Sequence, residues 1–137
     1  MTTATTVRIT ARETKPSEAT SLSAMIMISA ERMKSVRIAF EVTDEHLNPA
    51  GTLHGGVLAT LVDTAMGTAV RSATDDDDVP ATSQLTVTYL RPGTTGPLEV
   101  TARVRTKGEH LTVCEAEVEQ DGKAIGHAVA TFALLHG

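Results

Sequence analysis

Asn48-Pro-Ala-Gly-Thr-Leu-His54-Gly55-Gly56 runs directly into the mostly apolar segment 57–69, Val-Leu-Ala-Thr-Leu-Val-Asp-Thr-Ala-Met-Gly-Thr-Ala. Two successive glycines let the backbone approach another molecule closely. A helix that begins at this point presents backbone N–H groups that have no partner inside the helix. These groups carry a partial positive charge, which suits a polarised carbonyl or a developing oxyanion. The stretch therefore predicts a helix whose first turn can bind a polar group of another molecule.

The predicted helix has two different faces. Apolar side chains recur at the i, i+3, i+4 spacing of a buried stripe; they are Val57, Leu58, Leu61, Val62, Ala65, Met66, Ala69 and Val70. The opposite face carries one acid among small or weakly polar residues; it consists of Thr60, Asp63, Thr64, Gly67 and Thr68. A solvated face normally carries Lys, Glu and Arg, so we expect this face to pack against another surface. Asp63 is then either a partly desolvated functional carboxylate or an ordinary polar residue, and the helix alone leaves both open.

Length and composition favour one cytoplasmic domain. The 137 residues suffice for one compact domain, and the net charge of -5 argues against a nucleic-acid-binding surface. No apolar run approaches the roughly 20 residues of a membrane span, and the first residues lack the pattern of a secretion signal. The single cysteine, Cys114, lies in an alternating pattern, where a buried thiol is expected rather than a nucleophile. We therefore expect no nucleic-acid or membrane partner.

Alternation of apolar and polar residues predicts the strands. We assign them to Met25–Ser29, Ser35–Val42, Thr82–Leu90, Leu98–Lys107, Leu111–Gln120 and Ala124–Leu135. Asp121-Gly122 between the last two is a strong hairpin signal. Residues 1–23 are rich in Thr, Ser and Ala and receive no firm structure; a flexible leader or a short added strand or helix are the alternatives. Residues 24–137 form the expected domain.

This order of elements predicts an α+β fold. Two strands, one long helix and four further strands suggest a curved antiparallel sheet of about six strands wrapped around one central helix. The edge strands and the second helix face still need cover, which another copy of the chain can supply. The expectation is a homo-oligomer, a dimer or a tetramer formed as a dimer of dimers.

Three features together resemble one protein family. They are the block from Asn48 to Gly56, Asp63 nine residues after His54, and the later Thr82-x6-Tyr89-Leu-Arg-Pro92. In this combination they resemble the hotdog-fold acyl-CoA thioesterases of the phenylacetate-pathway (PaaI-like) type, over roughly residues 24–135. His-Gly-Gly alone would be a weak signal. The resemblance implies a hotdog fold and hydrolysis of an acyl-CoA thioester to a free acid and CoA, with no cofactor because CoA is part of the substrate.

The resemblance also implies roles for individual residues. The Gly55 N–H would polarise the thioester carbonyl, with the amide of Asn48 as a second contact and His54 orienting the turn. Asp63 would be the general base or the nucleophile, acting on substrate held by the neighbouring subunit. Thr82 would help to hold the attacking water.

Further residues are expected at the substrate. Gly56 and Arg91 are predicted substrate contacts, and so is Ser83, which is the alternative to Thr82 for the water. Arg105, Lys107 and Lys123 also lie near predicted turns, where each is either a phosphate ligand of CoA or an ordinary surface charge. We place the acidic segment 75–78 away from those phosphates, because it would oppose their binding.

The sequence offers less for a metal site and for two other functions. The histidines have no ligand spacing, so no metal site is expected; they are His46, His54, His110, His127 and His136. A hotdog hydratase or dehydratase is less favoured, because the helix offers Asp63 without a histidine of its own. A non-catalytic domain that binds acyl thioesters stays the third reading.

Overall fold

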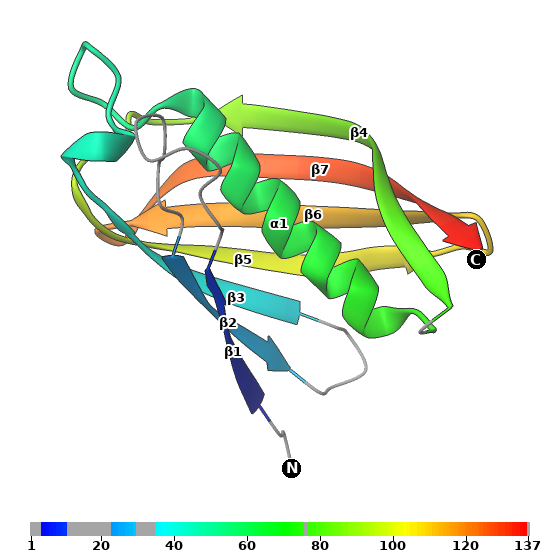
Figure 1. Cartoon of the computed structure of the whole chain (residues 1–137). Helices are drawn as coiled ribbons and strands as arrows, with labels where there is room; N and C mark the ends of the chain where they lie inside the picture. The colour runs from blue at the N-terminus through cyan, green and yellow to red at the C-terminus, as the bar shows by residue number, and fades with distance from the viewer. Residues whose placement is uncertain (1–3, 11–22, 30–34, 76, 137) are drawn as a thin grey trace.

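A computed structural model describes residues 4–10, 23–29, 35–75 and 77–136. Its elements are β1 (Ala4–Thr10), β2 (Ser23–Ser29), β3 (Ser35–Val42), the 3-10 helix η1 (Asp44–His46), α1 (Gly55–Ala73), β4 (Asp78–Tyr89), β5 (Gly96–Lys107), β6 (Leu111–Gln120) and β7 (Lys123–His136). The strands form one antiparallel sheet in the order β1-β2-β3-β5-β6-β7-β4. The helix α1 crosses one face of the sheet (Figure 1). The α+β class and the single long helix are as predicted.

The sheet has seven described strands rather than about six. The additional strand is β1, which lies in the segment 1–23 that the sequence left without firm structure and pairs with β2 along Ala4–Thr10. β4 begins at Asp78 rather than at the predicted Thr82, because the long strand β7 reaches far enough to pair with it. Pro80 lies in this extension, and an edge strand tolerates a proline that a central strand would not.

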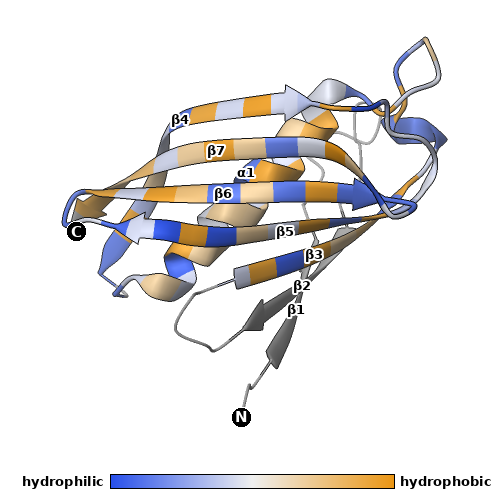
Figure 2. Cartoon of the chain, turned by 180° about the vertical axis from the view of Figure 1, so that it is seen from behind, coloured by the Kyte–Doolittle hydropathy of each residue, from blue (hydrophilic) through white to orange (hydrophobic). Residues whose placement is uncertain are grey.

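The core lies between α1 and the inner face of the sheet. The helix buries the predicted apolar stripe except Val57, which is half-buried. Along β6, the even-numbered residues from Thr112 to Gln120 are buried and face α1, whereas the odd-numbered residues are more exposed. Figure 2 shows the alternation of hydrophobic and hydrophilic residues along the strands from the side away from the helix. Period-two burial against one helix is clearest in β3 and β6, and it is why these strands could be recognised from the sequence.

The predicted hairpin at Asp121-Gly122 is confirmed. Asp121 has φ 52° and Gly122 has φ 75°, so both turn residues adopt the left-handed conformation. This pair of positive φ angles belongs to a turn whose twist matches that of the two strands it joins. The turn fixes the register of β6 against β7, where Gln120 pairs with Lys123.

Cys114 is fully buried on the inner face of β6, and desolvation raises the pKa of its thiol from 9.0 to about 12. About one thiol in 10,000 is then ionised at pH 8, and the thiolate is the reactive form. We expect the native protein to show no more than trace reaction with a dithiobis-nitrobenzoate reagent at pH 8. The same protein unfolded in guanidinium should release one equivalent of dye per chain, and equal labelling rates in both states would contradict the burial.

Candidate functional site

The first turn of α1 is organised by His54. His54 is the N-cap residue, and its Nδ1 accepts a hydrogen bond of 3.0 Å from the N–H of Gly56. Its backbone carbonyl accepts from the N–H groups of Val57 and Leu58. The bond from Leu58 is the first regular bond of the helix, and His54 therefore pairs two of the N–H groups that the helix itself cannot pair, those of Gly56 and Val57. The His54 N–H itself is held by the carbonyl of His46 at 2.8 Å.

The N–H of Gly55 differs from its neighbours. Gly55 is the first residue of α1, where no carbonyl of the helix can reach its N–H. Within the described residues this N–H has no hydrogen-bond acceptor. Of the two predicted glycine contacts, Gly55 thus presents an available donor, whereas the N–H of Gly56 is already bound to His54.

Tyr89 contacts the same turn from the end of β4. Its hydroxyl donates to the carbonyl of Gly55 at 2.8 Å. A Cβ atom on Gly55 would lie 3.2 Å from this hydroxyl, so the close approach favours glycine at that position. In the sequence Tyr89 stands out only as part of a motif, because a contact between residues 34 positions apart has no local signal.

An open pocket of about 430 Å³ lies in front of the turn. It is lined by Thr52, Leu53, His54, Gly55, Gly56, Leu58, Tyr89, Arg91, Pro92 and Gly93. One wall is the segment after β4, where the carbonyl of Gly93 accepts from the N–H of Leu53 at 2.8 Å. The buried side chain of Gln120 bonds both the N–H and the carbonyl of Thr94, which holds that wall in place. The pocket thus brings His54, Gly55, Gly56 and Arg91 together.

Asp63 and Thr82 form a second cluster. The Thr82 hydroxyl donates to Oδ1 of Asp63 at 2.7 Å. The pairing of β4 with β7 is shifted between Thr82 and Gln84, which places a bulge at Ser83. Ser83 instead bonds the carbonyl of Thr131 at 3.1 Å. Of the two alternatives left open by the sequence, Thr82 is the residue beside Asp63. Asp63 itself is half-buried, and Thr82 is exposed.

The two clusters lie apart within one chain. Gly55 and Asp63 are eight residues apart on the same helix, which corresponds to about 12 Å of rise along its axis. A single carbonyl group cannot contact both. The chain by itself presents a donor site at the start of α1 and a carboxylate site more than two turns further along.

Asn48 shapes its own loop. Its Oδ1 accepts from the N–H groups of Ala50 at 3.0 Å and Thr52 at 3.1 Å. Its Nδ2 donates to the Thr52 hydroxyl at 2.9 Å. Asn48 does not line the pocket. The described contacts of Asn48 are therefore those of a turn-forming residue that supports the segment leading to His54.

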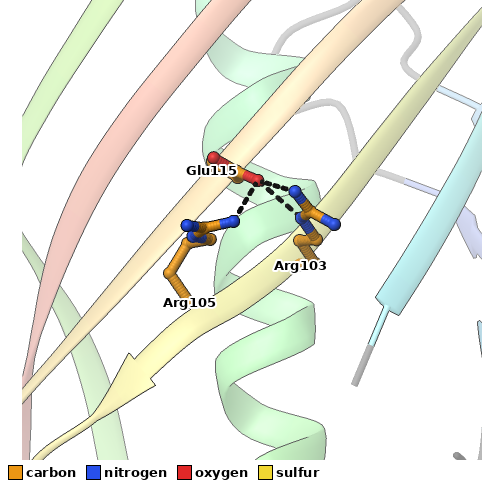
Figure 3. A network of polar contacts seen from close by, with 3 residues as sticks. All are labelled: Arg103, Arg105 and Glu115. Carbon is orange, nitrogen blue, oxygen red and sulfur yellow. Dashed lines mark hydrogen bonds and ion pairs between the residues drawn. The ribbon is translucent and has the colours of Figure 1, made fainter. Parts of the chain in front are cut away.

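The four cations considered as phosphate ligands lie in different places. Arg91 lines the pocket and donates to the carbonyl of Ala124 at 3.3 Å. Arg105 shares the carboxylate of Glu115 with Arg103 on the outer sheet face (Figure 3). Lys107 donates to the last helical carbonyl, that of Ala73, at 2.8 Å. Lys123 lies exposed beside the β6–β7 turn. Arg91 alone of the four lines this pocket.

The acidic residues after the helix lie away from the pocket. The described ones, Asp75, Asp77 and Asp78, follow the C-terminal end of α1, at the opposite end of the helix from the pocket. Among the described residues, no three His, Cys, Asp or Glu side chains are arranged to hold a metal ion. Likewise, no helix in the described part of the chain is long and apolar enough to cross a membrane.

Comparison with known proteins gives consistent matches. Residues 50–126 match the thioesterase superfamily. The chain is 34% identical over 91 residues to acyl-coenzyme A thioesterase 13 of Homo sapiens, covering 66% of this chain and 63% of that protein. It therefore spans less than two thirds of the length of this relative.

Two solved structures are similar as well. The PaaI protein of the phenylacetic acid degradation operon of E. coli has 30% identity and a TM-score of 0.69, covering 75% of this chain and 74% of that one. The BH2602 protein of Bacillus halodurans, whose crystal structure contains CoA, has 31% identity and a TM-score of 0.70. That match covers 72% of this chain and 66% of the other.

Asn48→Ala tests the role of the loop. The N–H groups of Ala50 and Thr52 lose their acceptor, so we expect the free energy of unfolding to fall by about 1–2 kcal/mol. Chemical denaturation measures this change. Asn48→Asp is the matched control, because it keeps the acceptor and loses only the donor to Thr52, and its loss should be smaller. Unchanged stability of Asn48→Ala would show that the loop does not depend on this side chain.

Proposed function

This chain belongs to the thioesterase superfamily, and we propose that it hydrolyses an acyl-CoA thioester to a free acid and CoA. The observation that carries the proposal is the available N–H of Gly55, a residue at the start of α1 that lines an open pocket. The names of two relatives support the substrate class, since one is an acyl-coenzyme A thioesterase and another was crystallised with CoA. CoA enters as part of the substrate, and the proposed reaction uses no separate cofactor.

The Gly55 N–H supplies the electrophilic half of the reaction. A donor fixed before the substrate arrives stabilises the negative charge that develops on the thioester oxygen. The helix start adds a partial positive charge at the same point. His54 contributes by fixing the turn through Gly56, and Arg91 at the pocket wall is placed to contact a phosphate of CoA.

Asp63 supplies the other half. Thr82 fixes one carboxylate oxygen, and its hydroxyl lies where it can also hold a water molecule. Asp63 takes a proton from this water while the oxygen of the water attacks the thioester carbon. The C–S bond then breaks and releases the CoA thiolate and the acid. Attack by Asp63 itself is the alternative course, in which water hydrolyses the resulting acyl-enzyme.

We further propose that each active site is built from two subunits. The separation of Gly55 from Asp63 along α1 supports this, because a second copy must bring its own carboxylate to the turn of the first. The edge position of β4 and the exposed Thr60 and Thr64 on the Asp63 face offer it a contact surface. A homodimer, or a tetramer formed as a dimer of dimers, in the cytoplasm is the proposed state.

Gly55→Pro tests the N–H donor. Proline is tolerated at the first helical position, and the extended conformation of His54 suits a following proline. The substitution removes the donor, so we expect kcat to fall about 100- to 1000-fold with acyl-CoA substrates. Gly55→Ala is the control, since it adds a Cβ and keeps the N–H. An equal loss in both variants would mean that the N–H is not used.

Asp63→Asn tests the carboxylate and the shared site together. Alone, it should lower kcat about 100- to 10,000-fold without dissociating the oligomer. An equal mixture of Asp63→Asn subunits and Gly55→Pro subunits should regain about a quarter of the wild-type activity. Half of the dimers in such a mixture contain one subunit of each kind, and one of the two sites in each mixed dimer combines an intact Gly55 with an intact Asp63. Hydrolysis is followed by free CoA. No recovery in mixed dimers that have demonstrably formed would contradict the two-subunit site.

A further inference from the structure

Tyr89 is the residue whose position the proposed reaction leaves unexplained. It is the single tyrosine of the chain, and it is 54% exposed, so burial of its ring does not hold it. Its hydroxyl is nevertheless committed to one acceptor, the carbonyl of Gly55 at 2.8 Å. A large exposed side chain usually keeps its rotamer freedom, which this hydrogen bond removes.

The acceptor belongs to a peptide group that is held at both ends. The carbonyl of the Gly55–Gly56 peptide accepts from Tyr89, and the N–H of the same peptide donates to Nδ1 of His54. Gly55 is also the first residue of α1, where its carbonyl accepts the regular helical bond from the N–H of Ala59, and the two glycines add no side chain that restricts the plane. Hydrogen bonds at the two opposite edges of the peptide group, one at its C=O and one at its N–H, resist rotation of the plane. Each bond also polarises the other through the peptide.

Fixing this plane has two consequences. The preceding peptide, which carries the Gly55 N–H, is joined to this plane through Cα of Gly55, so with Gly55 in the helical conformation its direction follows that of the held plane. In addition, Nδ1 of His54 acts as an acceptor and carries no proton, so in the neutral ring the proton lies on Nε2. Both the donor and the tautomer at the pocket thus depend on one chain of contacts from Tyr89 to His54.

We propose that Tyr89 is a positioning residue, which aims the Gly55 N–H by holding the Gly55–Gly56 peptide through its hydroxyl. The expected effect of Tyr89 on catalysis rests on the proposed thioester hydrolysis. Tyr89 acts without touching the thioester carbonyl, because its hydroxyl is already directed at Gly55. Loss of the Tyr89 hydroxyl should therefore lower the rate of the chemical step and leave substrate binding unchanged.

Tyr89→Phe is the central test, because it removes the hydroxyl and keeps the ring. We expect kcat to fall about 10-fold with KM within about two-fold of wild type, as for the loss of an interaction that matters only in the transition state. Thr88→Val is the matched control, since it removes a hydroxyl from the neighbouring exposed residue of β4, and its kinetics should equal wild type. Wild-type kcat in Tyr89→Phe overturns the proposal.

A double substitution separates positioning from general loosening. A Cβ on Gly55 would press on the Tyr89 hydroxyl, so Gly55→Ala should disturb the same contact and lower kcat about 10-fold. Since both changes act on one constraint, Tyr89→Phe with Gly55→Ala should lose about 10-fold rather than about 100-fold. A fully additive loss, or a fall in kcat that accompanies a lower melting temperature and a raised KM, argues for a merely structural role and overturns the proposal.

An NMR measurement makes the inference independent of activity. In Tyr89→Phe the carbonyl carbon resonance of Gly55 should shift, and the amide exchange of Gly56 should accelerate, while amides in β6 stay protected as in wild type. Unchanged Gly55 and Gly56 signals overturn the proposal. If the wild-type protein hydrolyses no acyl-CoA, the proposed function fails, and these two signals still decide whether Tyr89 holds the peptide.

Discussion

An α-helix begins with backbone N–H groups that its own carbonyls cannot reach, and the site depends on how this chain divides them. His54 pairs two of them, Gly56 through its ring and Val57 through its carbonyl, which also accepts the first regular helical bond from Leu58. The N–H of Gly55 remains available, and Gly55 lines the pocket. A serine or aspartate cap would satisfy the same helix start, but a histidine also places a ring at the pocket wall. In the proposed reaction the carbonyl of the substrate pairs with this donor, which offsets the free energy lost by leaving it unpaired.

The loops around this turn are held by contacts that are distant in sequence. The segment 91–96 is fixed from one side by Gln120, a buried amide on β6, and from the other by the bond between Leu53 and Gly93. Asn48 closes the loop before the turn. Each of these groups holds a segment of backbone next to the pocket in place. A pocket built from glycine-rich segments needs such supports, because glycine restricts its own backbone very little.

Much of the fold was predictable because burial imposes a period that the sequence displays. The stripe from Val57 to Val70 defined α1, and alternation defined six strands. β1 was not assigned, since only Val7 and Ile9 of its seven residues are strongly apolar. Within the site, the motif identified His54, Gly55, Asp63 and Thr82. It did not reveal that Asn48 serves its own loop, nor that Tyr89 bonds Gly55, because these contacts follow from side-chain directions and from pairings 34 residues apart.

The bulge at Ser83 changes which side chains of β4 point toward the helix. Thr82 and Tyr89 are seven residues apart, and in a regular strand an odd separation puts two side chains on opposite faces. Both nevertheless contact α1, Thr82 at Asp63 and Tyr89 at Gly55. The extra residue of the bulge reverses the alternation once, so that a single strand can reach the helix at two points. A deletion of one residue between Thr82 and Tyr89 would leave β4 able to pair with β7, but it would turn one of these two side chains away from α1. Insertions and deletions in this interval are therefore constrained more strongly than substitutions.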